Sequence, residues 1–225
     1  MVTIVPTILA KDATTFEETL KKVWGMVKRV QFDIIDGKFA PAETAEPEVL
    51  KNIDTIVEFD AHLMVVRPEE WINRCVESGI TGVYGQVEQM GDVPKFVADA
   101  QAAGLRVGLA YDLGTSLEGL ENYINDLDGV LLMSVKAGAS GQTFDESVLE
   151  KIRTVRKMSK TIKIIIDGGL NVENIKKCFA AEWEEELSED ELDKSFMKME
   201  FAVGSDLYES SDLRVELENL EHLKH

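Results

Sequence analysis

Short apolar runs rich in β-branched residues alternate along the chain with amphipathic stretches. Short continuous apolar runs are typical of buried strands, and apolar residues spaced three and four apart are typical of helices. The pattern predicts strands at 2–6, 30–35, 56–62, 82–87, 106–111, 129–134, 162–166 and 199–203. It predicts helices at about 14–27, 46–53, 68–78, 92–103, 116–125, 145–158, 171–181 and 206–220.

Eight strands that each precede a helix indicate a parallel sheet, and eight such units closed on themselves form a (β/α)8 TIM barrel. An open doubly wound sheet is the competing architecture, but it usually has fewer strands and a Gly-rich first turn. The segment Pro6-Thr7-Ile8-Leu9 is no such turn. We therefore predict an α/β fold, a single TIM barrel domain over residues 1–225.

One segment interrupts the alternation, an acidic insertion at about 182–194. Residues 182–193 carry eight acidic side chains and no basic one. Such a run is usually a solvated surface element, and a docking site for a basic partner is the sharper alternative.

The formal net charge of -18 argues against nucleic acid and anionic membranes as partners. No apolar run approaches the roughly 20 residues needed to span a bilayer. The N-terminus lacks the basic and long apolar regions of a signal peptide, so we expect a cytoplasmic protein.

The stretch 30–39 is the first candidate for chemistry, because a buried strand ends there in two carboxylates and a glycine. Side chains alternate along a strand, so Gln31, Asp33 and Ile35 share one face and Asp36 points the other way. Catalytic residues of TIM barrels lie at the C-terminal ends of the strands. Asp33 is therefore predicted to face a pocket.

Asp167 ends the seventh predicted strand, nearly across the barrel from Asp33. Two carboxylates that face each other over a pocket suit proton exchange on opposite faces of one carbon, with one as base and the other as acid. The alternative is that each caps a strand end.

His62 lies at the end of the third predicted strand, and the other two of the three histidines lie near the C-terminus. With Asp33, Asp167 and Gln31 it forms a plausible set of nitrogen and oxygen ligands for Zn, Mn, Fe or Co. A cation there would polarise a carbonyl oxygen and stabilise an enediolate. A hydrogen-bonded structural histidine is the alternative.

Glycines follow three consecutive strands, in the segments Gly138–Gly141, Asp167-Gly168-Gly169 and Gly204-Ser205. In TIM barrels the loops after the last two strands commonly bind phosphate through backbone N–H groups and helix dipoles. Such a site would hold an anion without lysines, and so against the overall negative charge.

With these motifs in their order and spacing, the chain resembles the ribulose-phosphate 3-epimerase family from Pro6 to about Leu207. The matching segments are Pro6-Thr7-Ile8-Leu9, Asp33-Ile34-Ile35-Asp36-Gly37, His62-Leu63-Met64, 130–135, 138–144, Asp167-Gly168-Gly169 and Val203-Gly204-Ser205.

The resemblance implies that Asp33 is the base and Asp167 the acid of a reversible epimerisation at C3 of a ketose phosphate. It implies a divalent metal held by both carboxylates and His62. It assigns substrate contacts to Thr7, His62, Met64, Met133, Gly138, Ala139, Ser140, Gly141, Gly168, Gly169, Gly204 and Ser205. It also implies a homo-oligomer, either a dimer or a hexamer.

The chain departs from the family at several of these positions. Gln31 and Gln86 replace histidines, Ile35 replaces a methionine, and the loop 136–141 lacks the usual Pro and Phe. Because an amide carbonyl is a weaker and harder donor than an imidazole, Gln31 should disfavour zinc and favour Mn²⁺ or Mg²⁺.

We therefore expect a metal-dependent epimerase that interconverts D-ribulose 5-phosphate and D-xylulose 5-phosphate. The alternatives are a hexulose-phosphate 3-epimerase of the allulose 6-phosphate type and a non-catalytic sugar-phosphate binder. A lyase of the related decarboxylase and synthase families is disfavoured, because no Lys lies two residues after Asp33.

Overall fold

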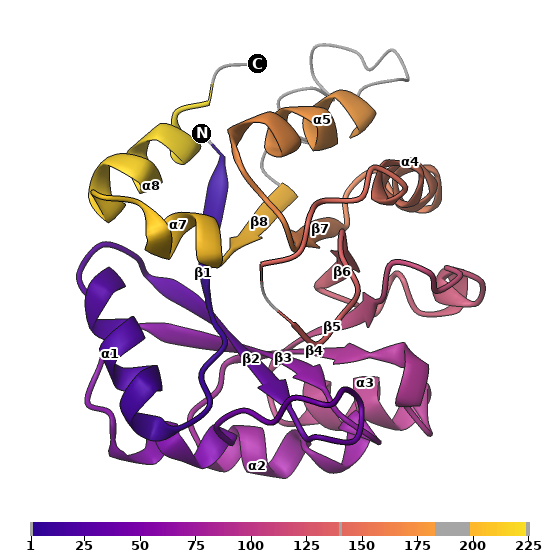
Figure 1. Ribbon diagram of the computed structural model, residues 1–225. Helices are drawn as coiled ribbons and strands as arrows, with labels where there is room; N and C mark the ends of the chain where they lie inside the picture. The colour runs from indigo at the N-terminus through magenta and orange to yellow at the C-terminus, as the bar shows by residue number, and fades with distance from the viewer. Residues whose placement is uncertain (1, 140, 183–198, 224–225) are drawn as a thin grey trace.

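The computed structural model describes residues 2–139, 141–182 and 199–223, apart from the side chain of Asp206. Its eight strands are all parallel and follow one another in sequence order around a closed barrel, which helices surround (Figure 1). The prediction of a (β/α)8 TIM barrel is confirmed. The strands are β1 Thr3–Ile8, β2 Arg29–Ile35, β3 Glu58–Met64, β4 Gly82–Gln86, β5 Arg106–Tyr111, β6 Gly129–Met133, β7 Lys163–Asp167 and β8 Met199–Val203.

The outer layer consists of α-helices and short 3-10 turns. The α-helices are α1 Ala13–Val23, α2 Ile72–Glu77, α3 Val93–Ala102, α4 Val148–Met158, α5 Val172–Glu182, α7 Ser205–Glu209 and α8 Leu213–Glu221. The 3-10 turns are η1 Pro47–Asn52, η2 Pro68–Glu70, η3 Val87–Gln89 and η4 Leu120–Asn122. No described helix is long and apolar enough to cross a membrane.

Four predicted helices differ from the structure. The segment 68–78 is divided into η2 and the short helix α2. The segment 46–53 is a 3-10 turn, and 116–125 contains only η4, because Gly119 adopts a left-handed φ of 89° that no α-helix accommodates. The segment 206–220 is divided into α7 and α8 by residues 210–212, where Asp212 caps α8 by accepting a hydrogen bond from the Val215 amide. The predicted acidic insertion lies outside the described residues except for Glu182, which is buried at the end of α5 and ion-paired with Arg156.

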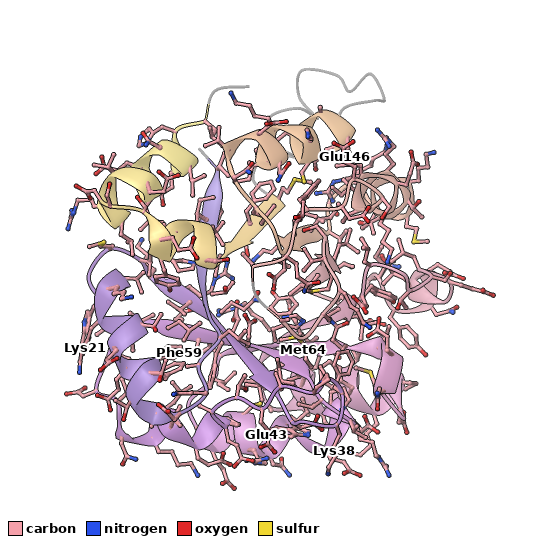
Figure 2. All side chains as sticks on the ribbon, in the orientation of Figure 1. Lys21, Lys38, Glu43, Phe59, Met64 and Glu146 are labelled. Atoms are coloured by element: carbon pink, nitrogen blue, oxygen red, sulfur yellow. The ribbon has the colours of Figure 1, made fainter. Side chains whose placement is uncertain are left out.

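Strand parity divides the core into two layers. Ile34 points outward into the large cluster between barrel and helices, whereas Ile35 points inward with Met64, Tyr84 and Met133. In Figure 2 the labelled Met64 lies near the centre of the view.

Charged side chains close the N-terminal end of the barrel. Arg29 pairs with Glu200 and, at 3.1 Å, with Asp60, while Arg106 reaches Asp60 at 2.8 Å and Lys163 reaches Glu200 at 2.8 Å. Because each buried carboxylate has two cationic partners, this end carries a network rather than isolated charges. The apolar layer and the C-terminal ends of the strands lie beyond it.

Gly108 is needed for the close packing of the barrel interior. A Cβ atom there would lie 2.4 Å from the Tyr84 ring and 2.6 Å from the Gly129 carbonyl oxygen. The neighbouring backbone cannot move aside without shifting a strand.

We expect Gly108→Ala to lower the free energy of unfolding by about 1–3 kcal/mol through overpacking. Urea denaturation of the two proteins measures the difference. Gly114→Ala is the matched control, because its Cβ would meet nothing within 4 Å. Equal stability of Gly108→Ala and wild type would contradict this account of the interior.

Candidate active site

A pocket of about 590 Å³ opens at the C-terminal ends of the strands. Its floor contains Asp33 from β2, His62 from β3 and Asp167 from β7, and its walls come mainly from the loops after β6, β7 and β8. Strand register places Asp33 beside His62 and Met133 beside Asp167. The barrel therefore gathers at one point residues that are far apart in sequence.

Gln31 joins the two carboxylates. Its Nε2 donates hydrogen bonds to Asp33 Oδ1 at 2.8 Å and to Asp167 Oδ2 at 2.6 Å. Gln31 is itself buried, so its amide meets no competing water and both bonds end on charged acceptors. The amide thus offsets part of the repulsion between two buried carboxylates.

His62 faces the same two carboxylates through Nδ1, and its other ring nitrogen faces Gln86. Its Nδ1 lies 3.3 Å from Asp33 Oδ1 and 3.4 Å from Asp167 Oδ2, and the ring is fully buried. Burial lowers the pKa of His62, but hydrogen bonds and charge from Asp167 and Asp33 outweigh it and raise the pKa to about 9.

The pKa of Asp33 is raised as well. Burial raises the pKa of Asp33, and the charge of Asp167 adds to the rise, while hydrogen bonds from His62 and Gln31 act against it. A carboxyl with a raised pKa suits proton uptake near neutral pH.

The donor set fits a divalent cation. Ligand atoms of Asp33, His62 and Asp167 lie within 4.8 Å of one another, and all three side chains are buried. Two carboxylate oxygens and an imidazole nitrogen suit several divalent metals. Gln31, predicted as a further ligand, presents its amide nitrogen to the group, so its carbonyl oxygen could ligate only after the amide rotates.

Ser134 fixes the turn that follows Asp167. Its amide and hydroxyl donate to the Asp167 carbonyl at 2.8 and 3.0 Å, and its hydroxyl also reaches the Gly168 carbonyl at 2.5 Å. These contacts tie β6 to the end of β7 behind the pocket. The orientation of Asp167 is therefore set by two strands.

Gly169 allows the loop after β6 to approach closely. Its φ is 58°, and a Cβ there would lie 2.4 Å from the Phe144 amide nitrogen. Asn174 of α5 donates to the Gly169 carbonyl at 2.8 Å, and Gln142 ties its own loop together through the carbonyls of Lys136 and Ala139. The glycine thus lets backbone form the pocket wall.

The two helices that follow the loops after β7 and β8 differ in the dipole that each could direct at an anion in the pocket. α5 begins three residues after Gly169 and runs for 11 residues, whereas α7 has only 5 residues. Because a helix dipole needs several aligned turns, the expected dipole contribution at Gly204-Ser205 is small. Backbone N–H groups are then the donors that remain for an anion at this position.

Most of the predicted site residues line this one pocket. They are Thr7, Asp33, His62, Met64, Met133, Gly138, Ala139, Gly141, Gly168, Gly169, Gly204 and Ser205. Gln31 lies behind the carboxylates rather than on the wall, and Ser140 lies outside the described residues. Asp36 points away and holds loops, accepting hydrogen bonds from the amides of Lys38, Phe39 and Val66.

Several lining residues were not predicted. They include Thr19 and Lys22 of α1, Asn171 just before α5, Asn174 of α5 and Tyr208 of α7. Lys22 Nζ lies 5.8 Å from the centre of the Tyr208 ring. Nothing in the sequence separates Lys22 from its neighbour Lys21, which pairs instead with Glu17. Asn171-x-x-Asn174 after two glycines is the signal that could have been used.

Known proteins resemble this chain in both sequence and structure. The profile of the ribulose-phosphate 3-epimerase family matches residues 3–185, which leaves Gly204 and Ser205 outside the match. Ribulose-phosphate 3-epimerase of Aquifex aeolicus is 32% identical over 185 residues, covering 79% of this chain and 83% of the relative. The Mycobacterium tuberculosis enzyme of the same name is 33% identical over 184 residues, covering 79% and 80%.

Among solved structures, 3-hexulose-6-phosphate synthase of Salmonella typhimurium superimposes with a TM-score of 0.67 at 13% identity. The superposition covers 97% of this chain and 96% of that one. At this identity the likeness concerns the fold alone.

The bridging amide should stabilise the protein measurably. We expect Gln31→Met to lower the free energy of unfolding of the chelator-treated protein by about 1.5–3 kcal/mol, the range for hydrogen bonds to charged groups. Urea denaturation checks this, with Gln89→Met as control, because Gln89 is an exposed glutamine of η3. A variant as stable as wild type would show that the carboxylates need no such donor.

Proposed function

The chain belongs to the ribulose-phosphate 3-epimerase family, and from that premise we propose that it interconverts D-ribulose 5-phosphate and D-xylulose 5-phosphate with a divalent metal. Family membership makes it an isomerase acting on carbohydrates. The observation that carries the finer proposal is the buried group of Asp33, Asp167 and His62 at the floor of the pocket.

Epimerisation at C3 needs a base on one face of the carbon and an acid on the other. In the proposed reaction the Asp33 carboxylate takes the C3 proton, and the electron pair moves onto the C2 carbonyl oxygen to give a cis-enediolate. Asp167 in its acid form then donates a proton to the opposite face of C3. The reverse reaction exchanges the two roles, so no proton or electron is gained or lost overall.

The residues around Asp33 and Asp167 support these roles as base and acid. Met64, Met133 and Val135 line the pocket beside the carboxylates with little exposure, so they limit water near a reactive enediolate. Gln31 and His62 hold the two carboxyl groups in fixed orientations. Pre-set geometry of this kind lowers the entropy lost on reaching the transition state.

Asp33, Asp167 and His62 would hold the metal, with Gln31 as a further oxygen ligand if its amide rotates. When bound, a divalent cation supplies Lewis-acid stabilisation of negative charge on the substrate oxygens. Zn, Mn, Fe, Co and Mg are the candidates, and the amide in place of an imidazole supports Mn²⁺ or Mg²⁺ over Zn²⁺.

The phosphate would lie at the other side of the pocket, against the backbone of Gly141, Gly168, Gly169, Gly204 and Ser205. This wall is made of glycine and serine backbone, which lets N–H groups approach an anion closely. Lys22 is the only lysine or arginine of the described residues that lines the pocket, and it adds positive charge at the rim.

We expect Asp33→Asn and Asp167→Asn each to lower the epimerisation rate by about 10²–10⁴-fold, the usual contribution of a positioned acid or base. A coupled assay of xylulose 5-phosphate formation gives the rates, and uptake of solvent deuterium at C3 follows the proton. Because each Asp serves one face of C3, each variant should lose exchange from one epimer preferentially.

Asp99→Asn on α3 controls for the change of side chain, because Asp99 is exposed and paired with Lys95. Epimerisation and deuterium uptake that survive in both active-site variants would refute the two-carboxylate mechanism. Phosphate binding without turnover under any of the five metals would instead favour a non-catalytic binder.

Replacing the amide by an imidazole should increase zinc affinity. We expect Gln31→His to bind Zn²⁺ about 10-fold more tightly or better than wild type, because a neutral imidazole is the softer ligand. Competition with a chromophoric chelator measures the dissociation constants after metal removal.

Gln101→His places the same new imidazole on the exposed face of α3, and it should leave zinc affinity unchanged. If both variants bind zinc as wild type does, position 31 does not take part in the metal site.

A further inference from the structure

The second nitrogen of His62 faces Gln86 at the end of β4. Both side chains are fully buried, and the Gln86 amide lies 3.1 Å from His62 Nε2. A glutamine amide can turn either its oxygen or its nitrogen to the ring, so the neighbours of Gln86 decide which atom His62 meets.

The two neighbours of the Gln86 amide are hydrogen-bond acceptors, so they require a donor. With the amide nitrogen turned away from His62, the Ala110 carbonyl oxygen lies 3.1 Å from that nitrogen and Glu88 Oε2 lies 2.8 Å from it. Both are acceptors, so both hydrogens of the amide are used by them. The carbonyl oxygen is the atom left for His62, and it can only accept, so Nε2 must carry a hydrogen.

The geometry points to Gln86 as a positioning residue that keeps a hydrogen on His62 Nε2 and thereby turns the Nδ1 atom toward Asp33 and Asp167. This inference rests on the metal-supported function proposed above. With the single hydrogen of the neutral ring on Nε2, Nδ1 is the nitrogen that can share a cation with the two carboxylates. Outer partners of this kind orient a ligating histidine and raise its basicity.

Glu88, which accepts from the Gln86 amide, is itself connected to the wall of the pocket. Glu88 Oε1 accepts a hydrogen bond from the Asp112 amide at 2.7 Å, and Asp112 Oδ1 accepts one from the Ala137 amide at 2.8 Å. Ala137 begins the loop that carries Gly138 and Ala139. One chain of hydrogen bonds thus links the imidazole to this loop.

Nuclear magnetic resonance of the metal-free protein tests the assignment directly. The chain has only three histidines, and His222 is exposed, so the ring nitrogens of His62 can be assigned with few overlaps. Because the pKa of His62 is raised to about 9, the spectra are recorded above that pH, where the ring carries a single hydrogen. We expect that hydrogen on Nε2 in wild type, with a slowly exchanging Nε2–H signal. In Gln86→Met we expect exchange roughly 10-fold faster or more, because the acceptor is gone. An unprotonated Nε2 in wild type would overturn the inference.

Metal affinity provides the second measurement. Calorimetry with Mn²⁺ alone should give a dissociation constant about 10–100-fold weaker for Gln86→Met than for wild type. Gln89→Met is the matched control, since Gln89 is an exposed glutamine three residues along and should bind Mn²⁺ as wild type does. The swap Gln86→Glu with Glu88→Gln keeps an acceptor toward His62 and should recover most of the affinity. Equal affinity in Gln86→Met and wild type would overturn the inference.

Neither measurement depends on turnover. If the epimerase assay fails while Nε2 is protonated and Mn²⁺ binding depends on Gln86, the proposed reaction is wrong and the positioning role stands. If turnover is found but Nε2 is unprotonated, the reverse holds. Should Gln86→Met fail to fold, the wild-type spectrum still decides.

Discussion

Two buried carboxylates cannot share the floor of a barrel unless something between them offsets their repulsion. Here Gln31 Nε2 bonds to both, and His62 Nδ1 faces both from the next strand. Each of these four residues is at most 8% exposed, so water contributes little to screening. The rest of the pocket is arranged around this constraint.

The barrel separates two polar layers that would otherwise disturb each other. Arg29, Asp60 and Glu200 form a compensated charge network at the N-terminal end. Tyr84, Leu131 and Ile165 lie in the apolar layer of the interior. Because that layer separates the two polar ends, substitutions in the site can alter chemistry without removing the network that closes the barrel.

The fold could be predicted from the sequence because the strand and helix patterns are local and are repeated eight times along the chain. Strand parity placed Asp33 inward and Asp36 outward, and the structure has both so arranged. The helix predicted at 116–125 was wrong because residue spacing does not reveal the left-handed backbone of Gly119.

The sequence could predict that Gln31 faces the centre of the barrel. It could not predict which end of the amide does so, since that depends on carboxylate oxygens from β2 and β7 together. Lys22 was missed because its place at the pocket rim likewise depends on a tertiary contact, that of α1 with Tyr208 of α7.

The overall charge of -18 makes the backbone wall of the pocket significant for any anionic substrate. A field of that sign repels a phosphate at long range, but over distances beyond about 8 Å salt screens it at physiological ionic strength. In the proposed binding mode, backbone N–H groups and Lys22 at the rim would act on the phosphate at short range. Acidic side chains are at the same time needed deeper in, where Asp33 and Asp167 carry the proposed proton transfers. In the proposed function, one wall of the pocket would bind the phosphate and the floor would carry the proton transfers, so that an anion could be held beside two carboxyl groups.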